Sequence, residues 1–280
     1  MSTISEQEII DYVEAMPAFP KSVNKVINLT SNMDSSAKDI VAAIEGDPVM
    51  TVKILKVINS AFYNLQTKVS SVQRALVIIG INTIKNLAIS VAIIGILKPY
   101  KTKLFDTDLF LEHSLATAFI CKSLAERQGI SALHSTDYFI AGLLHDFGKI
   151  VFAERFPERF NLALEESSET GTDLSLLEVT HLGINHAQVG YMLAVKWELP
   201  EELAKAIEEH HKPASNLFGH CLFAANQMAK QGELGTSGNP VIEPFPTECI
   251  ELFGADLDDL IEELGGIPAI KSTVQQLIGV

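Results

Sequence analysis

The chain has 280 residues, 47% of them hydrophobic and 20% charged, which is the composition of a folded globular protein and excludes a disordered one. The formal net charge of −14 argues against sequence-independent binding of nucleic acid, which needs clustered Lys and Arg side chains. Its three scattered cysteines form neither a disulfide framework nor a CxxC metal motif.

The first residues, MSTISEQEIIDYVE, are polar and acidic and lack the cationic start and apolar run of a secretory signal. The longest apolar run, residues 87–97, is shorter than the roughly 20 residues that a membrane-spanning helix needs. We therefore expect a cytoplasmic protein without a membrane partner.

Apolar residues recur every three or four positions along nearly the whole chain, which predicts an all-α fold. In the first part, Asp47 and Pro48 are typical of a helix start, with Asp as the N-cap and Pro at the first helical position. The stretch Lys98–Asp108 is a predicted linker. It divides the chain into a helical subdomain, residues 1–100, and a helical domain, residues 101–280.

Longer helices are expected beyond this linker. One of them contains AGLLHDFGKIVF, residues 141–152, and another begins near His186. Residues 231–246 are rich in Gly and Pro and predict a long loop. The acidic segment ADLDDLIEELGG, residues 255–266, predicts an amphipathic helix within an acidic C-terminal extension.

The pair His145 and Asp146 interrupts what otherwise reads as a buried helix, and burying a charge without partners is costly. Further histidines follow the same pattern on separate predicted helices: His113, His186, His210 and His211. Imidazole and carboxylate groups from several helices suit Zn, Fe or Mn. Asp146 is then the expected bridge between two ions about 3.5–4 Å apart. Lys149, on nearly the same helix face as Asp146, is placed to reach an anionic oxygen.

Each histidine taken alone also fits a core residue or a helix cap. His210 and His211 end a predicted helix, where donor side chains favour the last carbonyl groups without any metal. The remaining histidines, His134, His181 and His220, are interpreted as structural or surface residues.

The order of these histidines around His145-Asp146 resembles the HD superfamily of metal-dependent phosphohydrolases. The segments MPAFPKSVNKVINL, IEGDPVMTVKILKVINSAFY and SVQRALVIIGINTIKNLAIS resemble the front of the HDOD domain, a bacterial signalling relative of HD enzymes. Later, GYMLAVKWELPEELAKAIEEHH is similar to the same family. The resemblance implies an N-terminal helical subdomain packed on an HD-like helical core.

It also implies a role in bacterial signal transduction, in a family whose members have often lost the metal ligands. This chain keeps the histidines and Asp146 but carries Asn226 where active HD proteins have an aspartate. An amide oxygen brings no negative charge, so one metal position is expected to be weak. The residues after His211 lack the Gly-Tyr-Pro stretch of related cyclic di-GMP phosphodiesterases, which disfavours that substrate.

The leading interpretation is an HDOD-type signal-transduction module that binds a regulatory protein or a small phosphorylated ligand. The first alternative is a metal-dependent phosphohydrolase or phosphodiesterase in which Asp146 and Lys149 are catalytic, and the second is a di-iron redox protein. Enzymatic activity is left open at this point. One or two divalent ions (Fe, Zn, Mn or Mg) would be held by residues from this set: His113, His145, Asp146, His186, His210, His211 and Asn226.

Overall fold

The computed structural model of the chain describes residues 6–16, 21–31, 36–59, 67–96, 100–102, 104–131, 134–212 and 216–278. Within these ranges the regular structure is helical, and the one pairing of extended residues is an isolated bridge between Lys101 and Asp106. The predicted all-α fold is therefore confirmed. None of the helices in the described ranges has the length and apolar run that a membrane crossing requires.

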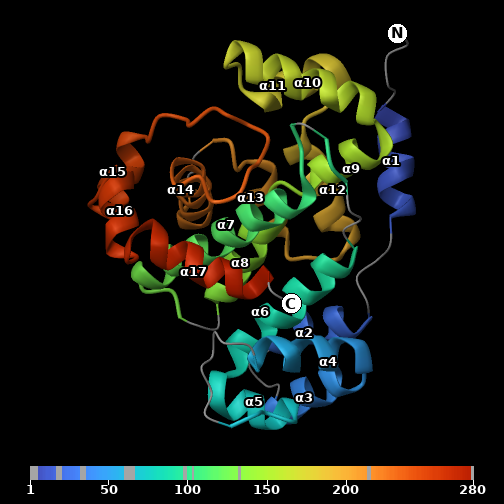
Figure 1. Cartoon of the computed structure of the whole chain (residues 1–280), viewed down its shortest axis with the longest axis vertical. Helices are drawn as coiled ribbons and strands as arrows, with labels where there is room; N and C mark the ends of the chain where they lie inside the picture. Colours follow the sequence, from blue (N-terminus) through green and yellow to red (C-terminus); the bar gives the residue numbers. More distant parts are fainter. Residues whose placement is uncertain are drawn as a thin grey trace.

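Six helices form the N-terminal part (Figure 1), and short polar side chains begin several of them. Asp47 Oδ1 accepts the backbone N–H groups of Val49 and Met50 at 3.1 and 3.0 Å, and Pro48 is the first residue of its helix, as predicted. The bounds are α1 Glu6–Ala15, α2 Lys21–Ser31, α3 Ala37–Glu45, α4 Pro48–Ile58, α5 Val72–Ile79 and α6 Ile81–Ile96.

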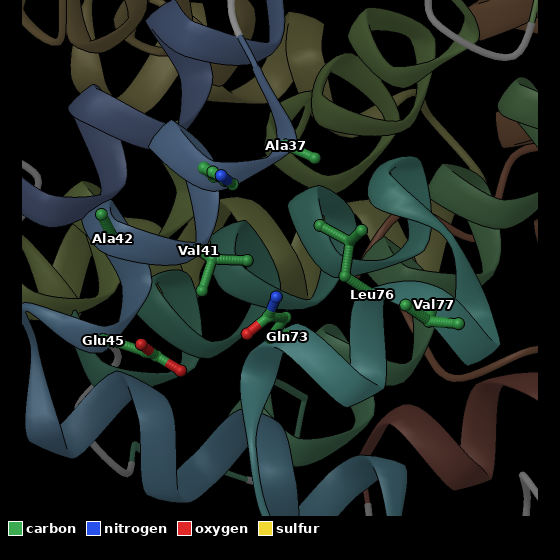
Figure 2. A pocket seen from close by; sticks show the side chains of 8 residues that line it. Ala37, Val41, Ala42, Glu45, Gln73, Leu76 and Val77 are labelled. Atoms are coloured by element: carbon green, nitrogen blue, oxygen red, sulfur yellow. The ribbon is translucent and has the colours of Figure 1, made fainter.

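An open groove of about 350 Å³ runs between α3 and α5 (Figure 2). Val41 and Leu76 line it, Lys38 and Glu45 lie along α3, and Val77 at its edge is 79% exposed. The groove belongs to helices that supply none of the predicted metal ligands.

Eight helices form the central part, with α7 packed against both α8 and α14. Gly142 permits the close approach of α8 to α7, because a Cβ atom at this position would lie 2.6 Å from the Cα of Ala118. The bounds are α7 Thr107–Arg127, α8 Ser135–Leu144, α9 Gly148–Arg155, α10 Pro157–Thr170, α11 Leu174–Leu182, α12 His186–Lys196, α13 Glu201–Glu208 and α14 Leu217–Gln231.

The N-terminal helices contact the central part at both ends of the subdomain's sequence. α6 packs on α8, and Lys85 Nζ, whose side chain is 1% exposed, lies 3.6 Å from Asp137 Oδ1. α1 packs on α9 and α12, and Tyr12 Oη donates to Glu154 Oε2 at 2.8 Å. The first helix thus contacts the central helices directly (Figure 1).

The predicted linker, Lys98–Asp108, lies partly outside the described residues, and α7 begins within it. Thr107 Oγ1 donates to the carbonyl of Tyr100 at 2.7 Å and closes the turn before α7. The division into residues 1–100 and 101–280 stays a prediction.

After α14, the described residues form three more helices: α15 Thr247–Phe253, α16 Leu257–Glu263 and α17 Gly266–Ile278. The predicted loop is observed, because residues 232–246 between α14 and α15 contain no helix. The acidic segment forms α16, which buries Leu257, Leu260 and Ile261 and leaves its acidic side chains outward, as an amphipathic helix does.

Candidate metal centre

His145 and Asp146 lie in a turn between two helices, which corrects the expectation of a single helix through residues 141–152. α8 ends one residue before His145, and α9 begins two residues after Asp146. Across this turn several backbone N–H groups bond to carbonyls three residues back and not four, as in a 3₁₀ helix.

Gly148 is the physical reason for the position of this turn. A Cβ atom there would lie 2.1 Å from the carbonyl oxygen of His186, so only glycine lets the start of α9 lie against the start of α12. Asn185 caps α12 through a capping box with Gln188, which fixes His186 as its first residue. The turn that contains His145 and Asp146 therefore lies against the start of α12 at His186.

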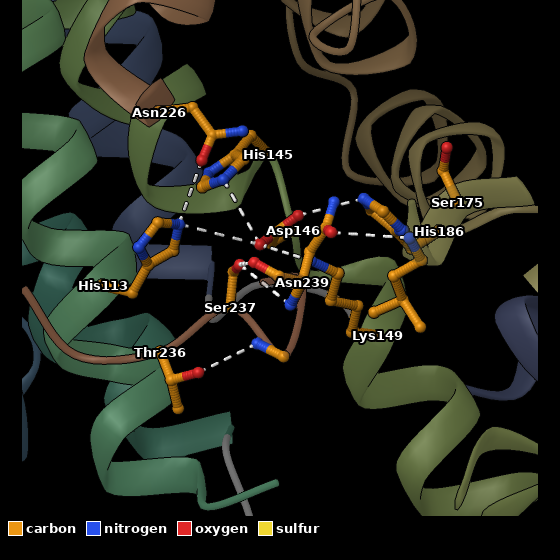
Figure 3. Close-up of polar contacts among 12 residues, drawn as sticks. His113, His145, Asp146, Lys149, Ser175, His186, Asn226, Thr236, Ser237 and Asn239 are labelled. Atoms are coloured by element: carbon orange, nitrogen blue, oxygen red, sulfur yellow. Dashed lines mark hydrogen bonds and ion pairs between the residues drawn. The ribbon is translucent and has the colours of Figure 1, made fainter. Parts of the chain in front are cut away.

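The carboxylate of Asp146 lies in the middle of the imidazole cluster (Figure 3). Its Oδ2 atom is 3.9 Å from Nε2 of His113 and 3.4 Å from Nε2 of His145. Its Oδ1 atom is 3.0 Å from Nε2 of His186 and 3.5 Å from Nε2 of His210. Each carboxylate oxygen thus faces its own pair of histidines, the arrangement that a bridging carboxylate needs.

Two further predicted residues border this cluster. Nε2 of His211 is 2.8 Å from Nε2 of His186, and Oδ1 of Asn226 is 3.2 Å from Nε2 of His113. All of the predicted ligand side chains are therefore brought together, although they come from α7, α12, α14 and the turns after α8 and α13.

Backbone carbonyls orient two of the imidazole rings. His145 Nδ1 is 2.8 Å from the carbonyl oxygen of Gly142, and His210 Nδ1 is 2.7 Å from that of Ile207. A carbonyl only accepts, so Nδ1 carries the proton and Nε2 keeps its lone pair. For His210 the helix-cap and ligand interpretations both fit, since one ring nitrogen caps α13 and the other faces Asp146.

Carboxylates orient two more rings. His186 Nδ1 is 2.5 Å from Oε2 of Glu178, and His211 Nδ1 is 3.1 Å from Oε1 of Glu243. A carboxylate or carbonyl partner on the outer nitrogen is what metal-ligating histidines usually have, because it fixes the tautomer and raises the basicity of the ring.

Charge at the centre is concentrated on Asp146 and His186. Burial works to raise the pKa of the Asp146 carboxyl, but His145, Lys149 and His186 outweigh it and hold that pKa well below its usual range. Burial works to lower the pKa of His186, and Glu178 outweighs it, so this pKa is raised. Glu178 and Asp146 therefore favour the protonated form of His186.

Burial holds His113, His210 and His211 in the neutral form. Burial lowers the pKa of His210 to about 3, and burial likewise lowers the pKa of His113 and His211 well below the ordinary value. Neutral imidazole is the form that binds metals, so these rings need lose no proton to act as ligands.

Lys149 and Asn226 distinguish the Oδ2 side of Asp146 from the Oδ1 side. Lys149 Nζ donates to Oδ2 at 2.7 Å, and its side chain is 1% exposed. Asn226, also 1% exposed, adds an amide oxygen without charge. The Oδ2 side therefore already contains a cation and has one anionic donor fewer than an aspartate at position 226 would give it.

Glu178 and Glu243 are the residues of the centre that sequence reasoning missed. Glu178 is fully buried on α11, and its position as the one acidic residue in the apolar stretch LSLLEVTHL was a usable signal. Glu243 lies in the loop of residues 232–246, where nothing in the sequence indicates proximity to His211. The three histidines interpreted as structural, His134, His181 and His220, bond instead to Ser131, Glu166 and Asn216.

Comparisons with known proteins agree with this fold. A solved HDOD domain protein of unknown function from Geobacter sulfurreducens superposes with a TM-score of 0.80 at 21% identity, covering 98% of this chain and 99% of that one. A candidate signal transduction protein from Marinobacter aquaeolei VT8 gives 0.78 at 25% identity, covering 100% of this chain and 61% of that one. A candidate phosphohydrolase from Shewanella amazonensis SB2B gives 0.73 at 25% identity, covering 96% and 97%.

Among curated proteins, an uncharacterised protein of Treponema pallidum (strain Nichols) is 28% identical over 203 residues. The match covers 72% of this chain but 39% of that relative, so this chain corresponds to part of a longer protein there.

In the part of the chain that the structure describes, helices surround a cluster of histidines centred on one aspartate. The chain belongs to the HDOD domain family, whose profile matches residues 16–213. Asn226, Glu243 and the loop that carries Glu243 lie beyond the matched residues.

Proposed function

We propose that this chain is an HDOD regulatory module for signal transduction whose His/Asp centre binds divalent metal. The observation that carries the proposal is the orientation of four rings: His145, His186, His210 and His211 each have Nδ1 tied to an acceptor. A cluster kept only for packing has no need of this uniform orientation. Membership of the HDOD family and the likeness to a candidate signal transduction protein support the regulatory role.

The donor set fits a metal by a second observation. Within the described residues, His145 Nε2 is buried without a hydrogen-bond partner. A buried polar atom normally has one, so this nitrogen lacks what a bound cation would supply. Imidazole-rich sites suit Zn or Fe better than Mg.

Asp146 would offer one carboxylate oxygen to each of two metal positions. His186, His210 and His211 would hold a metal with one oxygen, and His113, His145 and Asn226 a weaker one with the other. When bound, such an ion lowers the pKa of a water molecule and polarises a phosphoryl oxygen.

Phosphoester hydrolysis is the second candidate function, and the position of Lys149 favours it. Its ammonium group lies against Asp146 inside the centre, where it would stabilise negative charge developing on a phosphoryl group. The likeness to a candidate phosphohydrolase at 25% identity supports this reading. Asn226 weakens it, because the charge of the expected aspartate is missing.

Elemental analysis of freshly purified protein tests the metal centre, with Asp146→Asn as the matched variant. We expect Zn, Fe or Mn in the wild type and a loss of most of it in the variant, since Asp146 is the anionic donor that both sides share. A wild-type protein that stays empty after reconstitution would contradict the proposal.

Turnover of generic phosphodiesters and nucleotides, with Mn or Fe supplied, separates the two functions. Activity well above that of Asp146→Asn and Lys149→Met would favour the hydrolase. Metal binding without turnover would favour the regulatory module. The regulatory protein or phosphorylated ligand that the module recognises, and its cytoplasmic location, stay predictions.

A further inference from the structure

The loop of residues 232–246 connects α14 to α15 and lies against the metal centre. At one end, a Cβ atom on Gly235 would lie 2.5 Å from the backbone nitrogen of His113, so the loop backbone touches α7 at a candidate ligand. The N–H of Thr236 donates to the carbonyl of Leu109 at 3.0 Å. Figure 3 shows the loop residues Thr236, Ser237 and Asn239 beside His113 and Lys149.

The other end of the loop is held by α14, next to Asn226. Lys230 Nζ donates to the carbonyl of Val241 at 3.0 Å, and the N–H of Glu243 donates to Oε1 of Gln227 at 2.8 Å. These bonds fix the backbone on both sides of residue 242. They direct the Glu243 carboxylate to His211, with 3.1 Å between Oε1 and Nδ1.

His211 depends on this contact more than the other oriented rings depend on theirs. Its side chain is 15% exposed, whereas His186 and His210 are fully buried. It follows the end of α13, and its Nδ1 bonds to a carboxylate from a loop that is distant in the chain. Glu243 is the contact at Nδ1 of His211, while the other ring nitrogen, Nε2, lies 2.8 Å from Nε2 of His186.

Asp173, His211 and Glu243 also lie close enough together to suggest a separate cation site. The contacts of Asp173 argue against it, because Oδ1 accepts from Ser175 at 2.5 Å and Oδ2 accepts from Asn239 Nδ2 at 2.7 Å. Burial lowers the pKa of Lys230 and raises that of Glu243 to about 7, and the attraction of Lys230 to Glu243 and Asp173 works against the lowering. Glu243 therefore serves the imidazole and not another ion.

We propose that Glu243 is a positioning residue of the metal centre, which acts through His211 by keeping the proton on Nδ1 and the Nε2 lone pair toward His186. This rests on the proposed metal-binding function. Under this proposal the 232–246 loop, which lies outside the matched HDOD residues, orients one of the metal-binding histidines.

Zinc affinity, measured by competition with a chromophoric chelator, tests the proposal in four variants: Glu243→Ala, Glu243→Gln, His211→Ala and the double variant Glu243→Ala/His211→Ala. Loss of the acceptor in Glu243→Ala should weaken zinc binding by about 10- to 100-fold, as for other partners of metal-bound histidines. Glu243→Gln keeps an oxygen acceptor and should retain part of the affinity. Glu251→Gln, which removes an exposed charge from α15, is the matched control and should bind like the wild type.

The double variant separates positioning from a merely structural role. If Glu243 acts through His211, adding Glu243→Ala to His211→Ala causes no further loss of affinity. Additive losses would overturn the proposal. Thermal unfolding of each variant shows whether a loss of zinc affinity results from unfolding of the protein. If Glu243→Ala is unfolded, the zinc affinity of Glu243→Gln tests the role of Glu243 in its place.

¹⁵N NMR of the metal-free protein gives a readout that does not depend on metal binding. We expect His211 as the Nδ1–H tautomer in the wild type and a mixture in Glu243→Ala. A wild-type His211 protonated on Nε2 alone would overturn the proposal. If the wild type binds no zinc, the proposed function fails, and the tautomer still decides the role of Glu243.

Discussion

At the scale of single residues, Asn226 decides how the two sides of Asp146 differ. Its amide oxygen faces His113, which burial keeps neutral, so this pair carries no charge toward a cation. Lys149 on Asp146 Oδ2 adds a positive charge to the same side. The side with His186, His210 and His211 lacks a lysine and has the Glu178 carboxylate behind His186, so it is the side where we expect the tighter ion.

Asn226→Asp should therefore raise the affinity for a metal ion on the Oδ2 side of Asp146, where we expect the weaker binding. The added carboxylate attracts a divalent ion, and we expect affinity for a second equivalent to rise at least about tenfold, which corresponds to about 1.4 kcal/mol. Isothermal titration of metal-free protein with Zn²⁺ or Mn²⁺ measures it. Asn216→Asp adds the same charge to the same helix at its N-cap, away from the centre, and should change nothing. Equal second-site affinity in both variants would contradict this account of Asn226.

The residue types of the centre were predictable, and their orienting partners were predictable only in part. His113, His145, His186 and His210 were found from their order along the chain, because ligand types can be read without coordinates. The carbonyls at Nδ1 of His145 and His210 lie three residues back in the chain, and the helix-cap interpretation of His210 had indicated such a contact. The loop carboxylate of Glu243 at His211 depends on packing that no spacing encodes. Glu178 carried a signal, since a lone acid in an apolar helix already requires a buried partner.

At the scale of helices, starts were easier to predict than interruptions. Asp47 and Pro48 specify a start locally, through side-chain bonds to the first N–H groups and a fixed φ angle. The break at His145 and Asp146 has no such local signal. It follows from the contact of Gly148 with the backbone of His186, which is distant in the sequence.

The contact between α6 and α8 gives a prediction about stability. Lys85 is buried, with Asp137 as its charged partner at 3.6 Å, and burial lowers the pKa of Lys85. Asp137→Ala leaves the ammonium group buried and unpaired, so we expect a loss of about 3 kcal/mol of unfolding free energy. Lys85→Met removes the buried ammonium group and leaves Asp137, whose side chain is 29% exposed although its Oδ1 atom is buried, so the cost should be smaller than that of Asp137→Ala.

Urea unfolding of these two variants and of the double variant checks the asymmetry. The double variant should be more stable than Asp137→Ala alone, because the second change removes the unpaired ammonium group. Equal losses in both single variants would mean that the ion pair itself, and not the buried cation, stabilises the contact between α6 and α8.

At the scale of the whole molecule, the centre makes folding depend on pH. His113 and His210 have pKa values lowered by burial, to about 3 for His210, while an unfolded chain titrates near the ordinary value of 6.5. The unfolded state therefore takes up more protons than the folded state below pH 6.5. The stability that these rings contribute is present above that pH and is lost as the pH falls.

His186 works in the opposite direction. Its pKa is raised, so its contribution is fully present below pH 6.5 and is lost as the pH rises through the folded value. Three rings with lowered pKa values, those of His113, His210 and His211, oppose it. In chelator-treated protein the loss between pH 7 and pH 5 should be about 2 kcal/mol for each histidine with a lowered pKa, partly offset by His186 and by Glu243, whose pKa burial raises to about 7.

Urea midpoints of metal-free protein at pH 7 and pH 5 measure this balance. We expect the lower midpoint at pH 5, and His210→Gln should reduce the difference because one titrating ring is gone. His220→Gln, which changes a histidine outside the centre, should leave the difference as it is. A midpoint that rises at pH 5 would mean that protonation of His186 outweighs the neutral rings, and that the centre is most stable as a protonated cluster.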